Sequence, residues 1–250
     1  LTLSGAGNLF LGGGRVLGHA GTGGWTGSGT LYSTASGLGT LRLVSGTFTV
    51  GDAGLQDTGS QGGMLALEIQ AGATLRKSLG GTTSFSTGVT SVSNAGTVDI
   101  TGGTLSLTGS GTSTGTVTIA SGSTLQLSGG SGTQTMSGSV SGAGTVAGIG
   151  GTVVLTGSLN VTGTATSAGT LTVSGPVAAL GAVTITNGTL TVSAPVASAG
   201  SITLSGGTAN FNTNMTPTSL NQSAGTLGGT GNLTVSGAGT WSGGTMTGSG

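Results

Sequence analysis

Apolar and small polar residues alternate along this chain in short bursts, most of which begin just after a glycine. A period of two over a few residues is typical of a half-buried strand, with one face on the core and the other in solvent. No stretch keeps a helical period, and Gly and Thr are poor helix formers. The pattern therefore predicts an all-β protein. Bursts of this kind include Leu41/Leu43, Phe48/Val50, Leu65/Leu67/Ile69, Val98/Ile100, Leu105/Leu107, Val117/Ile119, Leu125/Leu127, Leu171/Val173, Val183/Ile185, Leu190/Val192, Ile202/Leu204 and Leu233/Val235.

The bursts themselves recur at a nearly fixed spacing. The segment 169–187 repeats at 188–206, an offset of 19 at which 11 of 19 positions are identical. Upstream, Leu105 meets Leu125 at an offset of 20. A unit of this length is too short for a propeller blade, which needs about 40 to 45 residues, and it lacks the consensus of a leucine-rich repeat.

A short period with strands and no helix predicts a single-stranded parallel β-helix, or β-solenoid, with coils of about 18–20 residues. Each coil lays its strands on the faces of a prism and turns at glycines, which adopt positive φ without a Cβ penalty. Division of the 250 residues by 19 gives about 13 coils. The expected inward stacks are Leu171 on Leu190, Val173 on Val192, Val183 on Ile202 and Ile185 on Leu204, and the outward ones are Thr170/Thr189/Thr208 and Thr172/Thr191.

We expect one solenoid over residues 1–250, cut from a longer chain that carries any export signal elsewhere. Regular repeats occupy 96–250, whereas 1–95 is less regular, with a loop predicted near 51–63. The competing interpretation is a flexible Gly/Ser/Thr linker. A linker has no reason to keep alternation in register across 19-residue offsets, so the solenoid is favoured.

Charge is scarce and unevenly distributed. Eight residues are charged, four of each sign, all at or before Asp99, and there is no Cys. Four Lys and Arg residues cannot supply a phosphate footprint, which argues against nucleic-acid binding. The longest apolar run, 177–183, is too short for a membrane-spanning helix, so no membrane insertion is expected.

The acidic residues are the first candidates for chemistry, because some parallel β-helices cleave polysaccharides with paired carboxylates. Asp52 and Asp57 fall in the predicted loop, and Glu68 alternates outward between apolar neighbours. We therefore interpret all three as solvated surface groups. Arg42 and Asp99 also fall at outward strand positions and are expected to be isolated charges or a weak exposed ion pair.

The remaining polar and aromatic candidates also favour structural interpretations. Arg76 and Lys77 are expected to form a solvated rim patch, and His19 has no Cys, second His or carboxylate near it in sequence that would suggest a metal site. Trp25 and Tyr32 suggest either a sugar-stacking pair or, preferably, core or cap packing. Five glycosylation-acceptor patterns, which chance explains in so Ser/Thr-rich a chain, begin at Asn160, Asn187, Asn214, Asn221 and Asn232.

The 19-residue Gly-Thr-Leu-x-Val rhythm resembles the repeats of filamentous haemagglutinin and of autotransporter passenger domains, which are secreted bacterial surface proteins. The resemblance covers the chain from about Thr97 onward and is looser before it. It implies a right-handed parallel β-helix and an extracellular location at the bacterial cell surface. Its motif carries no catalytic content, so it implies no catalytic, cofactor-binding or metal-binding residue.

The leading functional hypothesis is a non-enzymatic structural segment, a stalk or fibre of an adhesin-like surface protein that self-associates laterally or end to end. A host-surface or carbohydrate receptor is a further partner of this class. One alternative is ice binding through outward Thr-x-Thr pairs, although Thr191 is expected to meet Asn210 and so to interrupt the array. The other is a carbohydrate-binding or carbohydrate-cleaving β-helix that uses Asp52 or Glu68.

Overall fold

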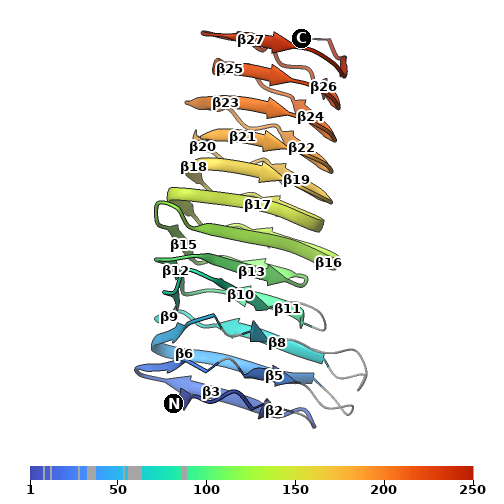
Figure 1. Cartoon of the computed structure of the whole chain (residues 1–250). Coiled ribbons are helices and arrows are strands. Elements are labelled where there is room, and N and C mark those ends of the chain that lie inside the picture. The colour runs from blue at the N-terminus through green and yellow to red at the C-terminus, as the bar shows by residue number, and fades with distance from the viewer. Residues whose placement is uncertain are drawn as a thin grey trace.

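The computed structural model describes residues 1–7, 9–11, 13–27, 29–32, 38–52, 54–55, 64–85 and 89–249. Over these residues the protein is all-β without helix, and its strands stack in parallel as a β-solenoid of about 11 turns. The two termini lie at opposite ends of the stack (Figure 1). The predicted fold class is therefore confirmed. None of the described segments forms a helix able to cross a membrane.

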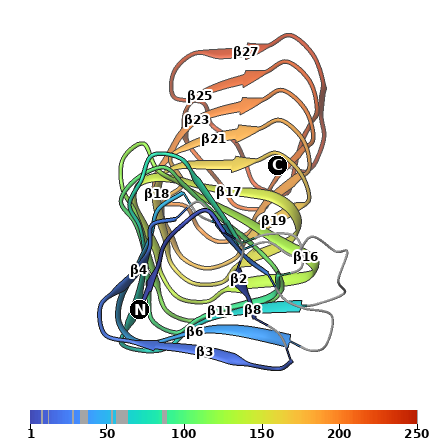
Figure 2. The same cartoon turned by 60° about the horizontal axis from the view of Figure 1, so that its bottom comes forward.

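The strands form three columns that share one interior (Figure 2). Four long strands, β6 (Leu38–Val50), β16 (Thr124–Met136), β17 (Val140–Leu155) and β18 (Leu159–Thr166), turn corners and belong to more than one column. The first column also contains β3 (Val16–Ala20), β8 (Met64–Ile69), β11 (Val89–Asn94), β14 (Gly111–Ser113), β19 (Thr170–Val173), β22 (Thr189–Val192), β24 (Thr208–Phe211), β26 (Thr226–Gly228) and β28 (Thr245–Met246). The second contains β1 (Thr2–Leu3), β4 (Gly23–Trp25), β9 (Ala73–Lys77), β12 (Thr97–Ile100), β15 (Thr116–Ile119) and β20 (Val177–Ala179). The third contains β2 (Leu9–Phe10), β5 (Thr30–Tyr32), β7 (Gly54–Leu55), β10 (Thr82–Phe85), β13 (Thr104–Thr108), β21 (Ala182–Ile185), β23 (Ala199–Leu204), β25 (Pro217–Gln222) and β27 (Gly239–Trp241).

The coils are not of equal length, which corrects the expected number of coils from about 13 to about 11. In the second column Val50 pairs with Lys77, an offset of 27, and in the third column Leu105 pairs with Leu125, an offset of 20. In the later coils of the first column Thr189 pairs with Thr208, an offset of 19. The longer early coils consume more chain per turn, so fewer turns fit into the chain.

The inward register follows the prediction closely. Leu171 lies on Leu190 and Val173 on Val192, and the four side chains are completely buried. On the third column Val183 pairs with Ile202 in the same way. Full burial of such side chains stabilises a fold by about 1.5–3 kcal/mol each, so these ladders hold successive coils together.

One corner of the later coils is built from a stack of glycines. Each has positive φ and directly precedes the first-column part of its coil; Gly151 does so within β17, just before Thr152. A Cβ on Gly169 would lie 2.4 Å from the carbonyl oxygen of Gly151 in the coil below, so both the conformation and the spacing require glycine. The stack consists of Gly151 (φ 55°), Gly169 (68°), Gly188 (72°), Gly207 (64°), Gly225 (75°) and Gly244 (84°).

The loop predicted near 51–63 falls largely outside the described residues. Within it, Gly54–Leu55 forms strand β7, which pairs with β5 on one side and with β10 on the other. This part of the predicted loop is therefore a rung of the third column.

Candidate functional site

The most regular surface feature is an outward row of threonines on the first column, one from each of seven successive coils. Each pairs in register with the next, and the spacing along the row is the strand separation of roughly 4.7–4.9 Å. Along its central part the row alternates with buried residues such as Leu171 and Leu190. We call this row the threonine rank; it consists of Thr133, Thr152, Thr170, Thr189, Thr208, Thr226 and Thr245.

The sequence predicted the three central members of this rank but missed four others. Thr152 pairs with Thr170 at an offset of 18, and Thr208 pairs with Thr226 at the same offset. A search at 19 alone steps past both pairs. For Thr152, Thr226 and Thr245 the preceding glycine is the signal that would have found them, because a positive-φ glycine marks the corner before each first-column segment.

A second outward row lies two residues further along each strand, and it is interrupted. Thr172 pairs with Thr191, as predicted, but Thr191 pairs with Asn210, and Asn210 pairs with Gly228. The prediction of an interrupted Thr-x-Thr array is therefore confirmed. The continuous element of the face is the single threonine rank.

The hydroxyl groups of the threonine rank are available to other molecules. In the part of the chain that the structure describes, no side-chain hydrogen bond joins these hydroxyls to protein atoms, in contrast to Thr97 and Thr116, whose Oγ1 atoms lie 3.2 Å apart. No Asp, Glu, Lys or Arg occurs from Ile100 onward. The rank is thus a continuous row of hydroxyls and methyls on a surface without formal charge.

The charged residues lie instead on the earlier coils, where they pair across the stack. Arg42 Nε donates to Glu68 Oε2 at 2.6 Å, and this hydrogen bond, followed by the charge of Glu68, raises the pKa of Arg42 above its ordinary value. Arg76 Nε donates to Asp99 Oδ2 at 2.9 Å. Both pairs are partly exposed, so solvent screens them and they add little to the stability of the fold. Of the two alternatives expected for Arg42 and Asp99, the structure shows the exposed ion pair, and each residue pairs with a partner in a neighbouring coil.

Lys77 departs from the expected solvated rim, and that prediction is wrong. In β9 the alternation turns Ala73, Leu75 and Lys77 inward, and the Lys77 side chain is fully buried. Its Nζ donates to Asp52 Oδ1 at 2.9 Å and to the carbonyl oxygen of Leu79. A buried ammonium is costly unless acceptors surround it, so Asp52 compensates a charge inside the rod.

The candidate acids do not converge on one site. Asp52, Glu68 and Asp99 each form an ion pair with a different basic side chain. Asp57 lies outside the described residues. Asp99 Oδ1 also accepts a hydrogen bond from Thr118. Among the residues that the structure describes, no group of three or more His, Asp or Glu side chains could hold a metal ion.

The aromatic candidates separate in the structure. Trp25 is buried in the core, as the packing interpretation predicted, and it does not pair with Tyr32. Tyr32 instead stacks on Phe10, with ring centroids 5.7 Å apart, and Phe10 is 65% exposed. His19 is buried against the edge of Phe48. The Phe10–Tyr32 pair joins two coils at an offset of 22, which the 19-residue period did not reveal.

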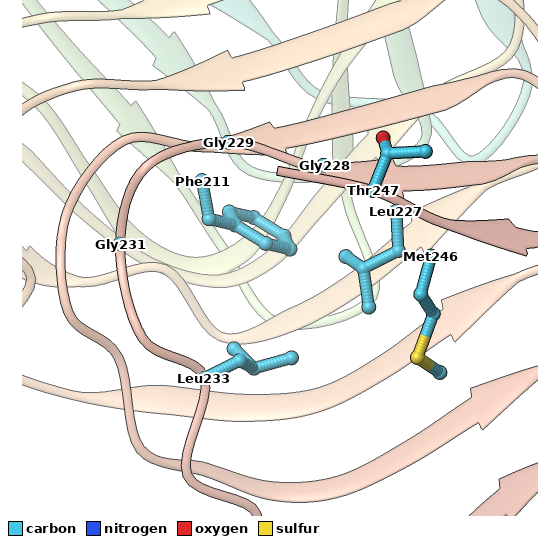
Figure 3. Close-up of a pocket in the computed structure, with 8 residues that line it drawn as sticks. All are labelled: Phe211, Leu227, Gly228, Gly229, Gly231, Leu233, Met246 and Thr247. Atoms are coloured by element: carbon cyan, nitrogen blue, oxygen red, sulfur yellow. The ribbon is translucent and has the colours of Figure 1, made fainter. Parts of the chain in front are cut away.

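The described residues of the later coils form a groove and a cavity. A groove on the second column is lined by Ser, Pro, Val and Ala side chains, and Pro176 and Pro195 occupy equivalent places in its two coils. A cavity of about 170 Å³ lies among the last coils, where Phe211, Leu227, Leu233 and Met246 surround it (Figure 3). Neither hollow contains a charged residue, so neither offers acid–base chemistry.

Comparison of the chain with family models, with curated proteins and with solved structures gave no match. The similarity to haemagglutinin and passenger repeats therefore rests on the repeat pattern and on the parallel solenoid.

Proposed function

We propose that this chain is a structural segment of an extracellular bacterial surface protein, a rigid stalk or fibre element that associates with further copies of itself. The fold supports the mechanical part of this proposal. About 11 turns stacked at one strand spacing form a rod of roughly 50 Å. Apolar ladders run through the interior, so a protease or a lateral force must disrupt several coils together.

The observation that carries the associative part is the uncharged threonine rank. Soluble domains usually keep a net charge away from zero, because neutral surfaces associate. Here the net charge is zero, and the later coils have no charge at all. One hydroxyl hydrogen bond contributes only about 0.5–1.5 kcal/mol net, but seven successive coils repeat the contact along the row. No catalytic role forms part of the proposal, because Asp52, Glu68 and Asp99 are each paired with a base of their own.

The test is sedimentation of the full chain at low and at high salt. We expect assemblies in both buffers, because the contact is not ionic. Thr189→Lys with Thr208→Lys places two charges on the rank and should give monomers. The matched control, Thr184→Lys with Thr203→Lys, adds the same charge on adjacent coils of the third column and should still assemble. Monomeric wild type in both buffers, or equal behaviour of the two variants, would contradict the role of the rank.

Ice binding is a second candidate, and one observation favours it. The threonine rank presents methyl and hydroxyl groups at a regular spacing over seven coils, whereas the neighbouring row is broken at Asn210. Thermal hysteresis decides this candidate: ice binding requires hysteresis in the wild type and its loss in Thr189→Lys. Wild-type protein without hysteresis would remove the candidate and leave the structural proposal standing.

A further inference from the structure

At the glycine corner beside the threonine rank, one of the residues that precede the corner glycines is chemically distinctive. The residue that precedes each of its six glycines is Gly or Ala in five coils. In the remaining coil this residue is Asn187, which is exposed and is followed by Gly188 at φ 72°. Asn187 is the only asparagine of the chain that a glycine follows.

The local geometry brings the Asn187 amide group onto the next peptide nitrogen. Gly188 N donates to Asn187 Oδ1 at 2.8 Å, so the side chain is folded toward the backbone of its own neighbour. The adjacent Thr189 N donates to Gly169 O, and Thr186 N donates to Thr166 O. Among the described residues, Gly188 N has no backbone acceptor. Glycine also has no Cβ that would hinder approach to this nitrogen.

We propose that Asn187 is a site of spontaneous deamidation. Gly188 N loses its proton to water or hydroxide and forms a bond to Asn187 Cγ. Nδ2 takes up a proton from water, the Cγ–Nδ2 bond breaks and ammonia leaves, which gives a five-membered succinimide. Water then adds to one of the two imide carbonyls and opens the ring, yielding aspartate or isoaspartate. The only co-reactant is water, and nothing is oxidised or reduced.

The product introduces charge where the chain has none. A carboxylate at position 187 is the first formal charge between Ile100 and Gly250, and it lies two residues before Thr189 of the rank. The isoaspartate form also adds a backbone atom at a corner where Gly207 of the next coil packs directly on the Asn187 backbone. The functional consequence rests on the proposed self-association. Because like charges on facing copies repel, slow conversion of Asn187 should weaken the assembly as the protein ages.

Other exposed asparagines of these coils provide internal controls. Asn160, Asn214, Asn221 and Asn232 are followed by Val, Met, Gln and Leu, whose side chains crowd the attacking nitrogen. Asn214 Oδ1 accepts from Asn232 N in the next coil and is thereby held away from its own neighbour. We expect these four residues to remain intact while Asn187 converts.

The experiment incubates the full chain in neutral and in mildly alkaline buffer and locates the products by peptide mass mapping and by isoaspartate detection. We expect conversion at Asn187 ahead of every other asparagine, faster at the higher pH, and loss of the signal in Asn187→Gln, whose longer side chain closes the ring poorly. An intact Asn187, or conversion no faster than at Asn160, would overturn the inference.

A parallel sedimentation measurement compares the aged chain and Asn187→Asp with the fresh chain. Smaller assemblies of the aged chain and of Asn187→Asp would support the proposed weakening of the assembly by conversion. Conversion at Asn187 with assemblies of unchanged size would retain the deamidation site and contradict the proposed role of the uncharged face, so the two failures are distinguishable.

Discussion

Lys77 lies inside the rod, and its ammonium nitrogen is 2.9 Å from a carboxylate oxygen of Asp52 in the preceding coil. The lysine side chain is wholly buried, whereas 48% of the aspartate side chain is exposed. The interior position of Lys77 lies between Val50 and Ile100 in the second column. A charge therefore occupies a place in an apolar ladder, and one partly exposed partner balances it.

Removal of Asp52 should destabilise the early coils. Asp52→Ala leaves a buried ammonium with the Leu79 carbonyl as its remaining acceptor. Breaking a fully buried pair costs about 3–5 kcal/mol, and we expect about 2–3 kcal/mol here because Asp52 is half exposed. Asp52→Ala combined with Lys77→Met removes the unpaired charge and should recover most of the loss. Urea unfolding followed by circular dichroism measures both; equal stability of the single and double variants would contradict the buried pair.

Adjacent positions of β22 should respond oppositely to the same substitution. Val192 is completely buried, so Val192→Asp places an unpaired charge in the core and should disrupt neighbouring coils. Thr191 points outward, and Thr191→Asp should change stability only slightly. Circular dichroism and limited proteolysis compare the two variants, and equal tolerance would refute the inside–outside assignment.

The glycine corner should be intolerant of alanine. Gly169→Ala must adopt φ near 68° and brings a Cβ to 2.4 Å from the Gly151 carbonyl, so we expect a loss of at least about 1–2 kcal/mol. Gly18→Ala is the control, because the nearest atom to its Cβ position is a Val44 methyl at 4.0 Å and its φ is not in the left-handed region. Thermal unfolding should therefore separate the two variants. Similar midpoints would show that the corner can relax.

Replacement of two buried polar residues by leucine should change the stability of the fold in opposite directions. The Oε1 of Gln134 has no hydrogen-bond partner in the described structure, and its Nε2 makes only long contacts of 3.4 Å or more. Gln134→Leu should therefore raise stability by about 1 kcal/mol. Asn94 Oδ1 accepts from Gly96 N at 3.0 Å, so Asn94→Leu leaves that donor unsatisfied and should lower stability. Denaturant midpoints test the contrast, and a loss of stability in both variants would mean that Gln134 is satisfied after all.

Alternation and glycine placement were enough to predict the parallel solenoid and the inward ladders of the later coils. There the offset between paired strands stays at 18 or 19, so vertical neighbours such as Leu171 and Leu190 can be assigned by offset alone. The sequence also locates every charge at or before Asp99, and with it the uncharged later coils that hold the threonine rank.

Only the tertiary structure decided which residues meet where coil length varies. Lys77 follows Leu75 in the inward alternation, so its burial could be predicted from the sequence. Its partner Asp52 could not, because the two residues are 25 apart and no repeat has that spacing. The Phe10–Tyr32 stack was hidden for the same reason, because its two residues are 22 apart. Alternation is a local property that fixes which face a side chain occupies. The neighbour above it depends on how many residues each turn consumes, and that number is set only when the coils close around a common core.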